Sequence, residues 1–247
     1  MMLPTLLGAR RRTVERAGLK AGERVLDVCC GSGASAIPAA EAVETGGRVI
    51  GVDLAEKLLD LARAKASARR LSNIEFRRGD MLDLRLPEGS FDVVACVFGI
   101  FFVPDMSAAV RALWGVVRPG GRLAITTWGP RFFEPASSVL KDAIREVRPD
   151  LYKGTNPWDR ITEPTSLRVL LREGGIREAE VSAEPGEHPI ASPEAWWSAV
   201  LGSGYRGTVE KLEPGHREFV RNANFHFVRH TGLRAVEANV VYALARK

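Results

Sequence analysis

The residues best suited to chemistry in this chain are a pair of glycines and an aspartate on either side of a short helix. The segment Val25–Gly33 reads Val-Leu-Asp-Val-Cys-Cys-Gly-Ser-Gly, and Val49–Asp53 follows it. This pattern predicts a strand, a glycine turn, a helix and a second strand that ends in an acid. Gly31 and Gly33 permit a sharp turn close to a ligand, and Asp53 is placed to accept hydrogen bonds from a ribose. We therefore expect a nucleoside-binding site.

Asp27, near the end of the first predicted strand, indicates which nucleoside binds. The run Gly31–Ala36 with Asp53 also satisfies the dinucleotide fingerprint, so an NAD-dependent oxidoreductase is an alternative. A pyrophosphate carries two negative charges, which the Asp27 carboxylate would repel at short range. S-adenosylmethionine instead carries an ammonium and a sulfonium beside one carboxylate. Asp27 can hold its amino-acid end through a charge-assisted hydrogen bond worth about 1.5–3 kcal/mol.

A third acid supports this choice. The segment Ile74–Met81 reads Ile-Glu-Phe-Arg-Arg-Gly-Asp-Met and predicts a short strand that ends in Asp80. A carboxylate at Asp80 can accept a hydrogen bond from the exocyclic amine of adenine, while the thioether of Met81 packs on the ring face. Three acids at three successive strand ends therefore predict one cofactor site.

Taken together, these residues resemble class I S-adenosylmethionine-dependent methyltransferases, in the small-molecule group that includes the ubiquinone and menaquinone C-methyltransferases. The resemblance implies transfer of a methyl group from S-adenosylmethionine to a small-molecule acceptor, with S-adenosylhomocysteine as product. Four blocks carry it in order: VLDVCCGSG at 25–33, VIGVDLAEKLLDLAR at 49–63, RRGDMLDLRLPEGSFDVVACVFGIFFVPD at 77–105 and LWGVVRPGGRLAITTWGP at 113–130.

The resemblance also implies which residues bind the cofactor. Asp27, with the two glycines of the turn, would contact the methionine part, and Asp53 the ribose hydroxyls. Asp80 and Met81 would contact the adenine. The full set of expected cofactor-binding residues is Asp27, Cys29, Gly31, Ser32, Gly33, Asp53, Leu54, Asp80, Met81, Val97 and Phe98.

Short apolar strands alternate along the chain with amphipathic helices at 34–44, 55–70 and 106–117. This alternation predicts parallel strands joined by helical crossovers. The expected fold is of the α/β class, with a doubly wound, Rossmann-like sheet and a helical lid insertion. The resemblance implies seven strands, mostly parallel, with an antiparallel last strand inserted between the fifth and the sixth.

A single domain over 1–247 is the simplest organisation for a chain of this length. Its C-terminal part is expected to hold a sixth strand over 176–191, helices over 193–201 and 214–230, and a closing strand over 236–245. The expected divisions are an N-terminal cap helix over 1–20, a cofactor-binding core over 21–129, a lid over 130–175, and C-terminal strands and helices over 176–247.

The lid is the expected site of acceptor specificity, because segments over the carboxyl ends of parallel strands usually bind the substrate. Two phenylalanines beside the methyl donor, Phe101 and Phe102, favour a flat, hydrophobic or aromatic acceptor. A cationic acceptor held by aromatic faces is an alternative. The expected substrate-binding residues are Phe101, Phe102, Trp128, Phe132, Phe133, Tyr152 and Trp158.

His188, on the predicted sixth strand, is the candidate catalytic base for an acceptor that must lose a proton. A purely structural histidine is the alternative. The transfer itself is expected to proceed in line, with positioning supplying about 7–11 kcal/mol of the catalytic effect.

Composition limits the partners. The formal charge is +5, but the arginines are interleaved with acids along most of the chain, so we expect no nucleic-acid partner. The densest basic cluster, Arg10–Arg12, lies in the predicted cap helix, where an anion-binding role is an alternative to a solvated surface. The other functional alternative is a protein that binds S-adenosylmethionine without catalysis.

Three cysteines lack the spacing of a zinc site or a disulfide framework, so we expect no metal and a reducing, cytoplasmic location. No apolar stretch has the length of a membrane span, and no stable membrane insertion is expected. The expected partner is the small-molecule acceptor, bound by a monomer or a homodimer.

Overall fold

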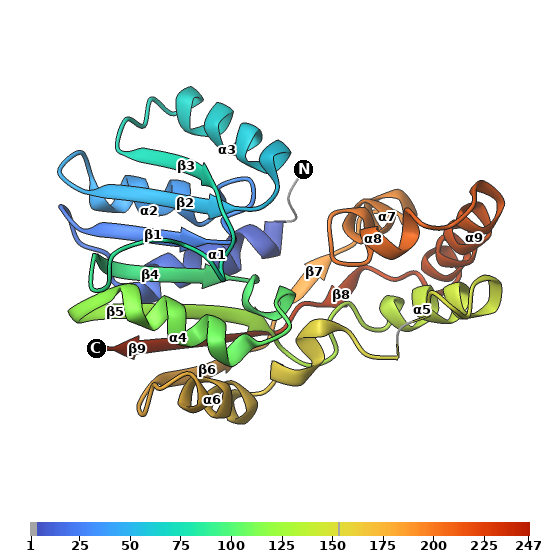
Figure 1. The fold of residues 1–247 in the computed structure, drawn as a ribbon. Coiled ribbons are helices and arrows are strands. Elements are labelled where there is room, and N and C mark those ends of the chain that lie inside the picture. The colour runs from blue at the N-terminus through green and yellow to red at the C-terminus, as the bar shows by residue number, and fades with distance from the viewer. Residues whose placement is uncertain (1–3, 153) are drawn as a thin grey trace.

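The protein is described by a computed structural model that covers residues 4–152 and 154–247, with side chains from residue 8 onward. Its centre is a seven-stranded sheet with the order β3-β2-β1-β4-β5-β9-β6 (Figure 1). β9 runs antiparallel to both β5 and β6, whereas the other neighbours pair in parallel. The expected doubly wound sheet with an inserted antiparallel last strand is confirmed. The strands are β1 (Arg24–Val28), β2 (Arg48–Asp53), β3 (Ile74–Arg78), β4 (Phe91–Val97), β5 (Val117–Trp128), β6 (Glu180–Glu184) and β9 (Val240–Arg246).

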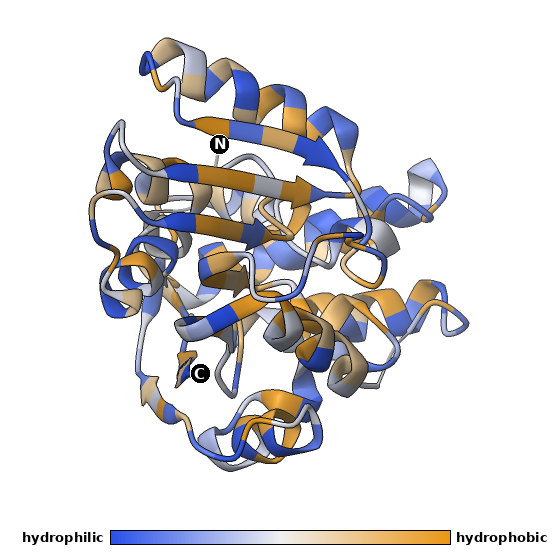
Figure 2. Ribbon diagram, turned by 60° about the vertical axis from the view of Figure 1, so that its left-hand side comes forward, coloured by the Kyte–Doolittle hydropathy of each residue, from blue (hydrophilic) through white to orange (hydrophobic). Residues whose placement is uncertain are grey.

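Helices cover both faces of this sheet. Alternate residues of β1 point to opposite faces, so Val25 joins an apolar cluster with α2 and α3, while Leu26 joins the cluster that contains α4 and α6. Figure 2 shows the central strands coloured mainly as hydrophobic, as a sheet buried on both faces requires. The covering helices are α1 (Pro4–Ala17), α2 (Ala36–Val43), α3 (Glu56–Ala68), α4 (Met106–Val116) and α6 (Pro164–Glu173).

The remaining helices form a separate layer at one end of the sheet, which we call the helical lobe (Figure 1). Within it, α5 packs along α9, and α7 packs on α9. Two short 3₁₀ helices, η1 (Ile100–Phe102) and η2 (Pro157–Ile161), pack against each other and against β5. The lobe consists of α5 (Ala136–Val147), β7 (Glu187–Pro189), α7 (Pro193–Leu201), α8 (Arg206–Val209), α9 (Pro214–Thr231) and β8 (Ala235–Glu237).

The lobe is built from two stretches that are distant in the sequence. One stretch follows β5 and contains α5, and the other lies between β6 and β9. The expected lid over 130–175 corresponds only to part of it, because α6 packs against α4 and β6 in the core. A role of the lobe as a lid stays a proposal.

Both C-terminal strands expected from the sequence are interrupted. The stretch 176–191 forms β6 and then, after Pro185 and Gly186, the separate strand β7. The stretch 236–245 is likewise divided into β8 and β9, and β7 pairs antiparallel with β8 in a two-stranded ribbon. The expectation of two unbroken strands is wrong, because the chain leaves the large sheet at the proline-glycine pair and re-pairs in the lobe.

Asn239 joins three of the segments that connect the core with the lobe. Its side-chain Nδ2 donates to the carbonyl of Pro130 at 3.0 Å and to Glu237 Oε2 at 3.0 Å. Its Oδ1 accepts from the N–H of Gly186 at 3.0 Å, and its own carbonyl accepts from the N–H of Gly129 at 2.6 Å. We call this arrangement the Asn239 joint.

Among the described residues, no helix combines the length and the apolar character that crossing a membrane would require.

Candidate cofactor and acceptor site

The site is located by the topology of the sheet. β1 pairs with β2 on one side and with β4 on the other, and Val28 lies opposite Cys96. The crossovers from β1 and β4 run to opposite sides of the sheet, and in open α/β sheets ligands bind at such a point, in the crevice outside the carboxyl ends of the strands. The loop that follows Val28 and the residues that follow Val97 therefore form its walls.

The loop after β1 turns on left-handed backbone. Gly31 has φ of 53° and Gly33 has φ of 78°, and Cys29 adopts φ of 59° although it carries a side chain. A Cβ added at Gly33 would lie 3.1 Å from Ile37 Cδ1 and 3.2 Å from Ala62 Cβ, so this glycine permits close packing of α2 and α3. The loop thus has the tight turn that the sequence predicted.

Gly99 closes the opposite wall of the crevice. A Cβ at this position would lie 2.4 Å from Cys29 Cβ and 2.8 Å from its Sγ, and 3.1 Å from Cys96 Sγ. Only glycine fits here without movement of the loop after β1. The turns after β1 and β4 are therefore packed directly against each other.

Asp27 is the buried acid of the site. Its side chain is almost fully enclosed, with 1% exposure, and Ser35 Oγ donates to its Oδ2 at 2.6 Å. Its Oδ1 has no hydrogen-bond partner among the described residues. Burial raises the pKa of Asp27 to about 7, with a smaller rise from Asp53, while Ser35 and Arg10 lower it. An enclosed oxygen of this kind can accept a hydrogen bond from a ligand cation.

Asp53 connects β2 with the glycine loop. Its Oδ2 accepts from the N–H of Gly31 at 2.8 Å, and its Oδ1 accepts from the N–H of Ala55 at 2.9 Å. Beside it, Lys65 on α3 donates to the carbonyl of Ser32 at 3.1 Å and to its Oγ at 2.9 Å. Lys65 could not be predicted from the sequence, since its position depends on how α3 packs against the loop.

The third acid lies in the turn after β3. This strand ends at Arg78, two residues earlier than expected, and Gly79 N–H donates to the carbonyl of Asp53 at 3.1 Å. Asp80 is exposed, and its Oδ1 accepts from the N–H of Leu82 at 2.9 Å. Met81 is buried in the core, whereas Leu54 is 60% exposed. The structure thus brings the segments of all three acids to one edge of the sheet.

Arg10 of α1 reaches the same crevice. Its guanidinium carbon lies 5.0 Å from the centre of the Phe98 ring, in a cation–π contact. Burial lowers the pKa of Arg10 to about 10, and the charge of Asp27 opposes this shift. The sequence placed Arg10 in a basic cluster, but the docking of α1 decides which arginine enters the site.

Four aromatic rings form a continuous stack from the crevice into the lobe, which we call the aromatic stack. Phe98 stacks on Trp128 with ring centres 3.7 Å apart, and Trp128 stacks on Phe132 at 4.1 Å. Phe132 stacks on Phe133 at 3.9 Å. All four side chains are buried, and Trp158 of η2 meets Phe132 edge-on at 5.7 Å.

The other expected acceptor residues differ in position. Phe101 is buried and meets Trp158 edge-on at 5.7 Å, whereas Phe102 is 62% exposed. Tyr152 lies under the guanidinium of Arg145 at 5.1 Å, and no ring contact is found between it and the aromatic stack within the described chain. Tyr205, which the sequence did not single out, is buried and meets Trp158 edge-on at 5.9 Å.

His188 lies on β7, opposite Val236, with 3% exposure. Its ring centre is 6.4 Å from that of Phe133, so it lies beside the Phe133 end of the aromatic stack, opposite the end formed by Phe98. Its Nδ1 is buried and has no hydrogen-bond partner among the residues that the structure describes. Burial lowers the pKa of His188 below its usual value, so the imidazole is neutral at pH 7.

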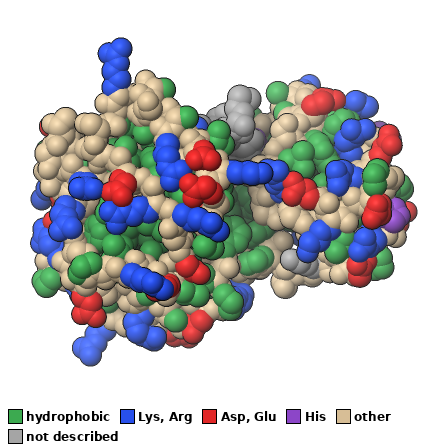
Figure 3. Space-filling view, turned by 45° about the horizontal axis from the view of Figure 1, so that its top comes forward, with side chains coloured by type: hydrophobic (Ala, Val, Ile, Leu, Met, Phe, Trp, Pro, Cys, Tyr) green, Lys and Arg blue, Asp and Glu red, His purple; other side chains and the backbone are tan. Residues whose placement is uncertain are grey.

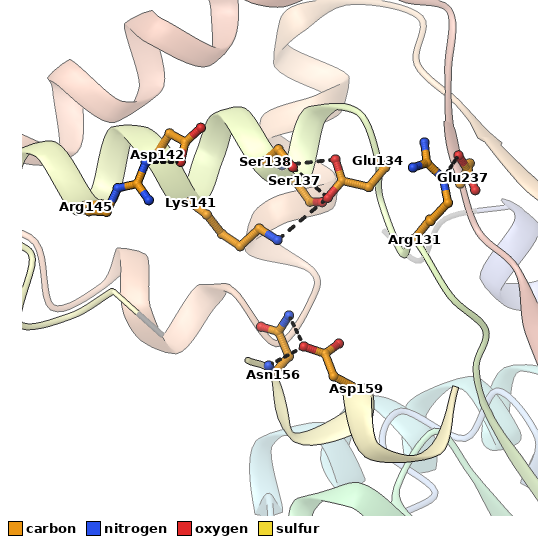
Figure 4. Close-up of polar contacts among 10 residues, drawn as sticks. All are labelled: Arg131, Glu134, Ser137, Ser138, Lys141, Asp142, Arg145, Asn156, Asp159 and Glu237. Carbon is orange, nitrogen blue, oxygen red and sulfur yellow. Dashed lines mark hydrogen bonds and ion pairs between the residues drawn. The ribbon is translucent and has the colours of Figure 1, made fainter. Parts of the chain in front are cut away.

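Polar side chains near the junction of lobe and core are largely engaged with each other (Figure 4). Glu134 accepts hydrogen bonds from Ser137 and Ser138 at the start of α5, and Lys141 lies 3.7 Å away. Asn156 and Asp159 form a capping box at the start of η2. Figure 3 shows the molecule narrowing between core and lobe, with charged side chains on both sides.

Comparison with known proteins agrees with this geometry. Residues 25–121 match a family model described as a methyltransferase domain. A nocamycin O-methyltransferase of Saccharothrix syringae is 31% identical over 235 residues, which cover 87% of this chain and 83% of that protein. A demethylmenaquinone methyltransferase of Oceanobacillus iheyensis is 39% identical over 114 residues, which cover 46% of this chain and 48% of that protein. The chain thus spans about half the length of the latter relative.

The crystal structure of an S-adenosylmethionine-dependent methyltransferase from Aquifex aeolicus has the same fold. The TM-score is 0.57 at 23% identity, and the match covers 72% of this chain and 86% of that one.

The sheet order and the glycine loop at its switch point define a Rossmann-like methyltransferase of class I. The chain belongs to the S-adenosylmethionine-dependent methyltransferase family, and S-adenosylmethionine is its cofactor. These comparisons do not favour the NAD-dependent alternative or a protein without catalysis.

Proposed function

We propose that the enzyme methylates a flat, hydrophobic or aromatic small molecule by in-line transfer from S-adenosylmethionine. The aromatic stack carries this proposal, because it runs from Phe98 at the cofactor crevice to Phe133, which contacts Trp196 of the lobe. Stacked aromatic pairs contribute about 0.5–1.5 kcal/mol beyond the area that they bury. A planar acceptor that separates two of these rings regains such contacts on both of its faces. Relatives named for nocamycin and demethylmenaquinone support a small-molecule acceptor.

The proposed donor site follows the strand ends. Asp27 receives the cofactor's ammonium on its unpartnered Oδ1, and Asp53 receives the ribose hydroxyls. The exposed position of Asp80 and Leu54 suits the adenine, with Met81 beneath them. The backbone of Cys29, Gly31, Ser32 and Gly33 and the side chains of Val97 and Phe98 complete the site.

His188 is the proposed base for an acceptor that carries a dissociable proton. The neutral imidazole has a buried Nδ1 without a partner in the described chain, as a base that binds a substrate proton requires. Because His188 contacts Phe133, it would act on an acceptor group that extends past Phe132 along the stack.

Trp128→Leu tests the proposed acceptor site. The change keeps an apolar side chain but removes the ring between Phe98 and Phe132. We expect KM for a planar phenol or quinol acceptor to rise about tenfold or more, whereas the Kd of S-adenosylhomocysteine changes less than about twofold. Methyl transfer from labelled S-adenosylmethionine is measured for three sets of acceptors of matched size. These are planar compounds, saturated compounds, and amines whose methylation gives a quaternary ammonium product.

Phe219→Leu on α9 is the matched control, since Phe219 is 41% exposed and lies far in sequence from the four residues of the aromatic stack.

In the same assay, His188→Gln should lower kcat for acceptors that lose a proton and remove the acidic limb of the pH profile. The proposal of an aromatic acceptor would be contradicted if the wild-type enzyme preferred saturated acceptors and if Trp128→Leu left KM for the acceptor unchanged.

A further inference from the structure

Two opposite charges from different elements meet in the cofactor crevice. Asp27 lies on β1, and Arg10 lies on α1, which packs against β4 and β5. Burial raises the pKa of Asp27 and lowers the pKa of Arg10, so it favours the neutral form of each group. The opposite charge of the other residue favours the ionised form of each. Phe98 provides an apolar surface beside the guanidinium.

The other arginines of α1 do not share this environment. Arg11 has a side chain that is 77% exposed and pairs with Glu15 at 3.2 Å. Arg12 lies 3.8 Å from Glu184, and Arg16 also pairs with Glu184. Arg10 is therefore distinguished on this helix by its ring contact with Phe98 and its charge interaction with Asp27.

We infer that Arg10 binds the carboxylate of S-adenosylmethionine while Asp27 binds its ammonium, so that the N-terminal helix is a part of the donor site. This inference rests on the proposed donor site and extends it to a residue outside the glycine loop. An α-amino acid group is a zwitterion, and its two charges match one cation and one anion held at the same crevice. Arg10 and Asp27 each gain an opposite charge when the cofactor binds, and the net charge of the site is unchanged by this pairing.

The inference also explains the unpartnered Oδ1 of Asp27. Ser35 occupies only the Oδ2 atom, so the second oxygen has a capacity that the cofactor's ammonium would fill. The carboxylate of the same ligand would then lie toward α1, where Arg10 offers a planar donor group. Binding of the cofactor would consequently hold α1 against the sheet.

Decarboxylated S-adenosylmethionine tests this pairing directly, because it keeps the ammonium and the sulfonium but lacks the carboxylate. Calorimetric titration of the full chain with both ligands gives their ratio of affinities. We expect the wild-type protein to prefer S-adenosylmethionine by about tenfold or more. The Arg10→Gln variant should bind both ligands with nearly equal affinity, and Arg10→Lys should recover part of the preference.

Arg11→Gln, one position along the same helix, is the matched control and should retain the wild-type ratio. A preference that survives in Arg10→Gln overturns the inference, as does an equal loss of affinity for both ligands in that variant, which would indicate a structural role. Wild-type protein that binds S-adenosylmethionine and its decarboxylated form equally well overturns the inference but leaves the donor site intact. Failure of the wild-type protein to bind either ligand would overturn the donor site as well.

Discussion

At the scale of single residues, the charge state of Asp27 is set by its surroundings. The groups that face it are Ser35 on the turn before α2, Arg10 on α1 and Asp53 on β2. Burial outweighs the three contributions that favour the ionised form, from Ser35, Arg10 and the backbone N–H of Ala36, so the carboxyl group titrates near neutral pH in the protein without cofactor. The amino-acid end of the cofactor supplies the cation that favours the ionised form.

Asp27→Asn should therefore flatten the dependence of stability on pH. The pKa of Asp27 is about 7 in the folded protein, against an ordinary value of 3.8. Between these values the folded state holds a proton that the unfolded chain releases, so stability falls as pH rises through this window and stays lower above it. One such proton changes the free energy of unfolding by up to about 1.4 kcal/mol per pH unit.

Thermal unfolding without cofactor, recorded from pH 5 to pH 8, measures this slope for both proteins. The variant should show a smaller decline than the wild-type protein, and its affinity for S-adenosylmethionine at pH 8 should fall about tenfold or more. Asp60→Asn is the control, because Asp60 is an exposed residue that pairs with Arg63 on the surface of α3. Parallel pH curves for the Asp27 variant and the wild-type protein would refute the assignment.

At the scale of elements, the contact between the turns after β1 and β4 determines the shape of the crevice. Gly99→Ala places a Cβ within 2.4 Å of Cys29 Cβ, and the nearest atoms are held by backbone at φ of 59°. Overpacking of this kind costs about 1–3 kcal/mol. We expect a midpoint of thermal unfolding several degrees lower and a cofactor affinity at least about tenfold weaker, since the displaced loop is the one that meets the cofactor.

Gly115→Ala is a suitable control for this experiment. Gly115 lies in α4, and a Cβ there would meet no atom within 4 Å. Alanine is favoured over glycine in a helix by up to about 1 kcal/mol, so this variant should be as stable as the wild-type protein or more stable. Equal behaviour of the two variants would show that the turns are not in close contact.

The elements also show how far sequence reasoning extends. The observed bounds of helices α2, α3 and α4 lie within two residues of the expected ones, because their apolar period is continuous. The break at Asn239 was missed, since alternation of apolar residues continues across it from Val236 to Leu244. The break at Pro185 was missed although Pro185 and Gly186 are residues that interrupt strands. Local periodicity predicts which side chains are buried, but it does not predict which strands pair with each other.

The candidate site follows the same rule. Asp27, Asp53 and the glycine loop were predictable because short-range spacing places them at strand ends. Arg10 was not distinguishable from its neighbours, because its entry into the crevice depends on how α1 packs against β4 and β5. The partners of the aromatic stack likewise depend on contacts between segments that are distant in the sequence.

At the scale of the whole molecule, the Asn239 joint links the segments that connect the lobe with the core. Asn239→Ala removes its side-chain hydrogen bonds to Pro130, Gly186 and Glu237. We expect faster hydrogen exchange in the lobe and a several-fold loss in kcat/KM for the acceptor, whereas the Kd of S-adenosylhomocysteine stays within about twofold of the wild-type value.

Asn222→Ala is the matched control for the joint, since Asn222 is an exposed residue on α9. It should leave both hydrogen exchange and kinetics at wild-type levels. Equal weakening of donor and acceptor binding in Asn239→Ala would instead mean that the joint stabilises the entire fold.

Both stretches that form the lobe follow β5 in the sequence. The residues that match the family model end at Gly121, before the first of these stretches begins, so the matched segment and the lobe occupy separate parts of the chain. Under the proposed function, sequence changes in the lobe can alter the acceptor while the proposed donor site is kept. A common methyl donor can in this way serve many metabolic products through one scaffold.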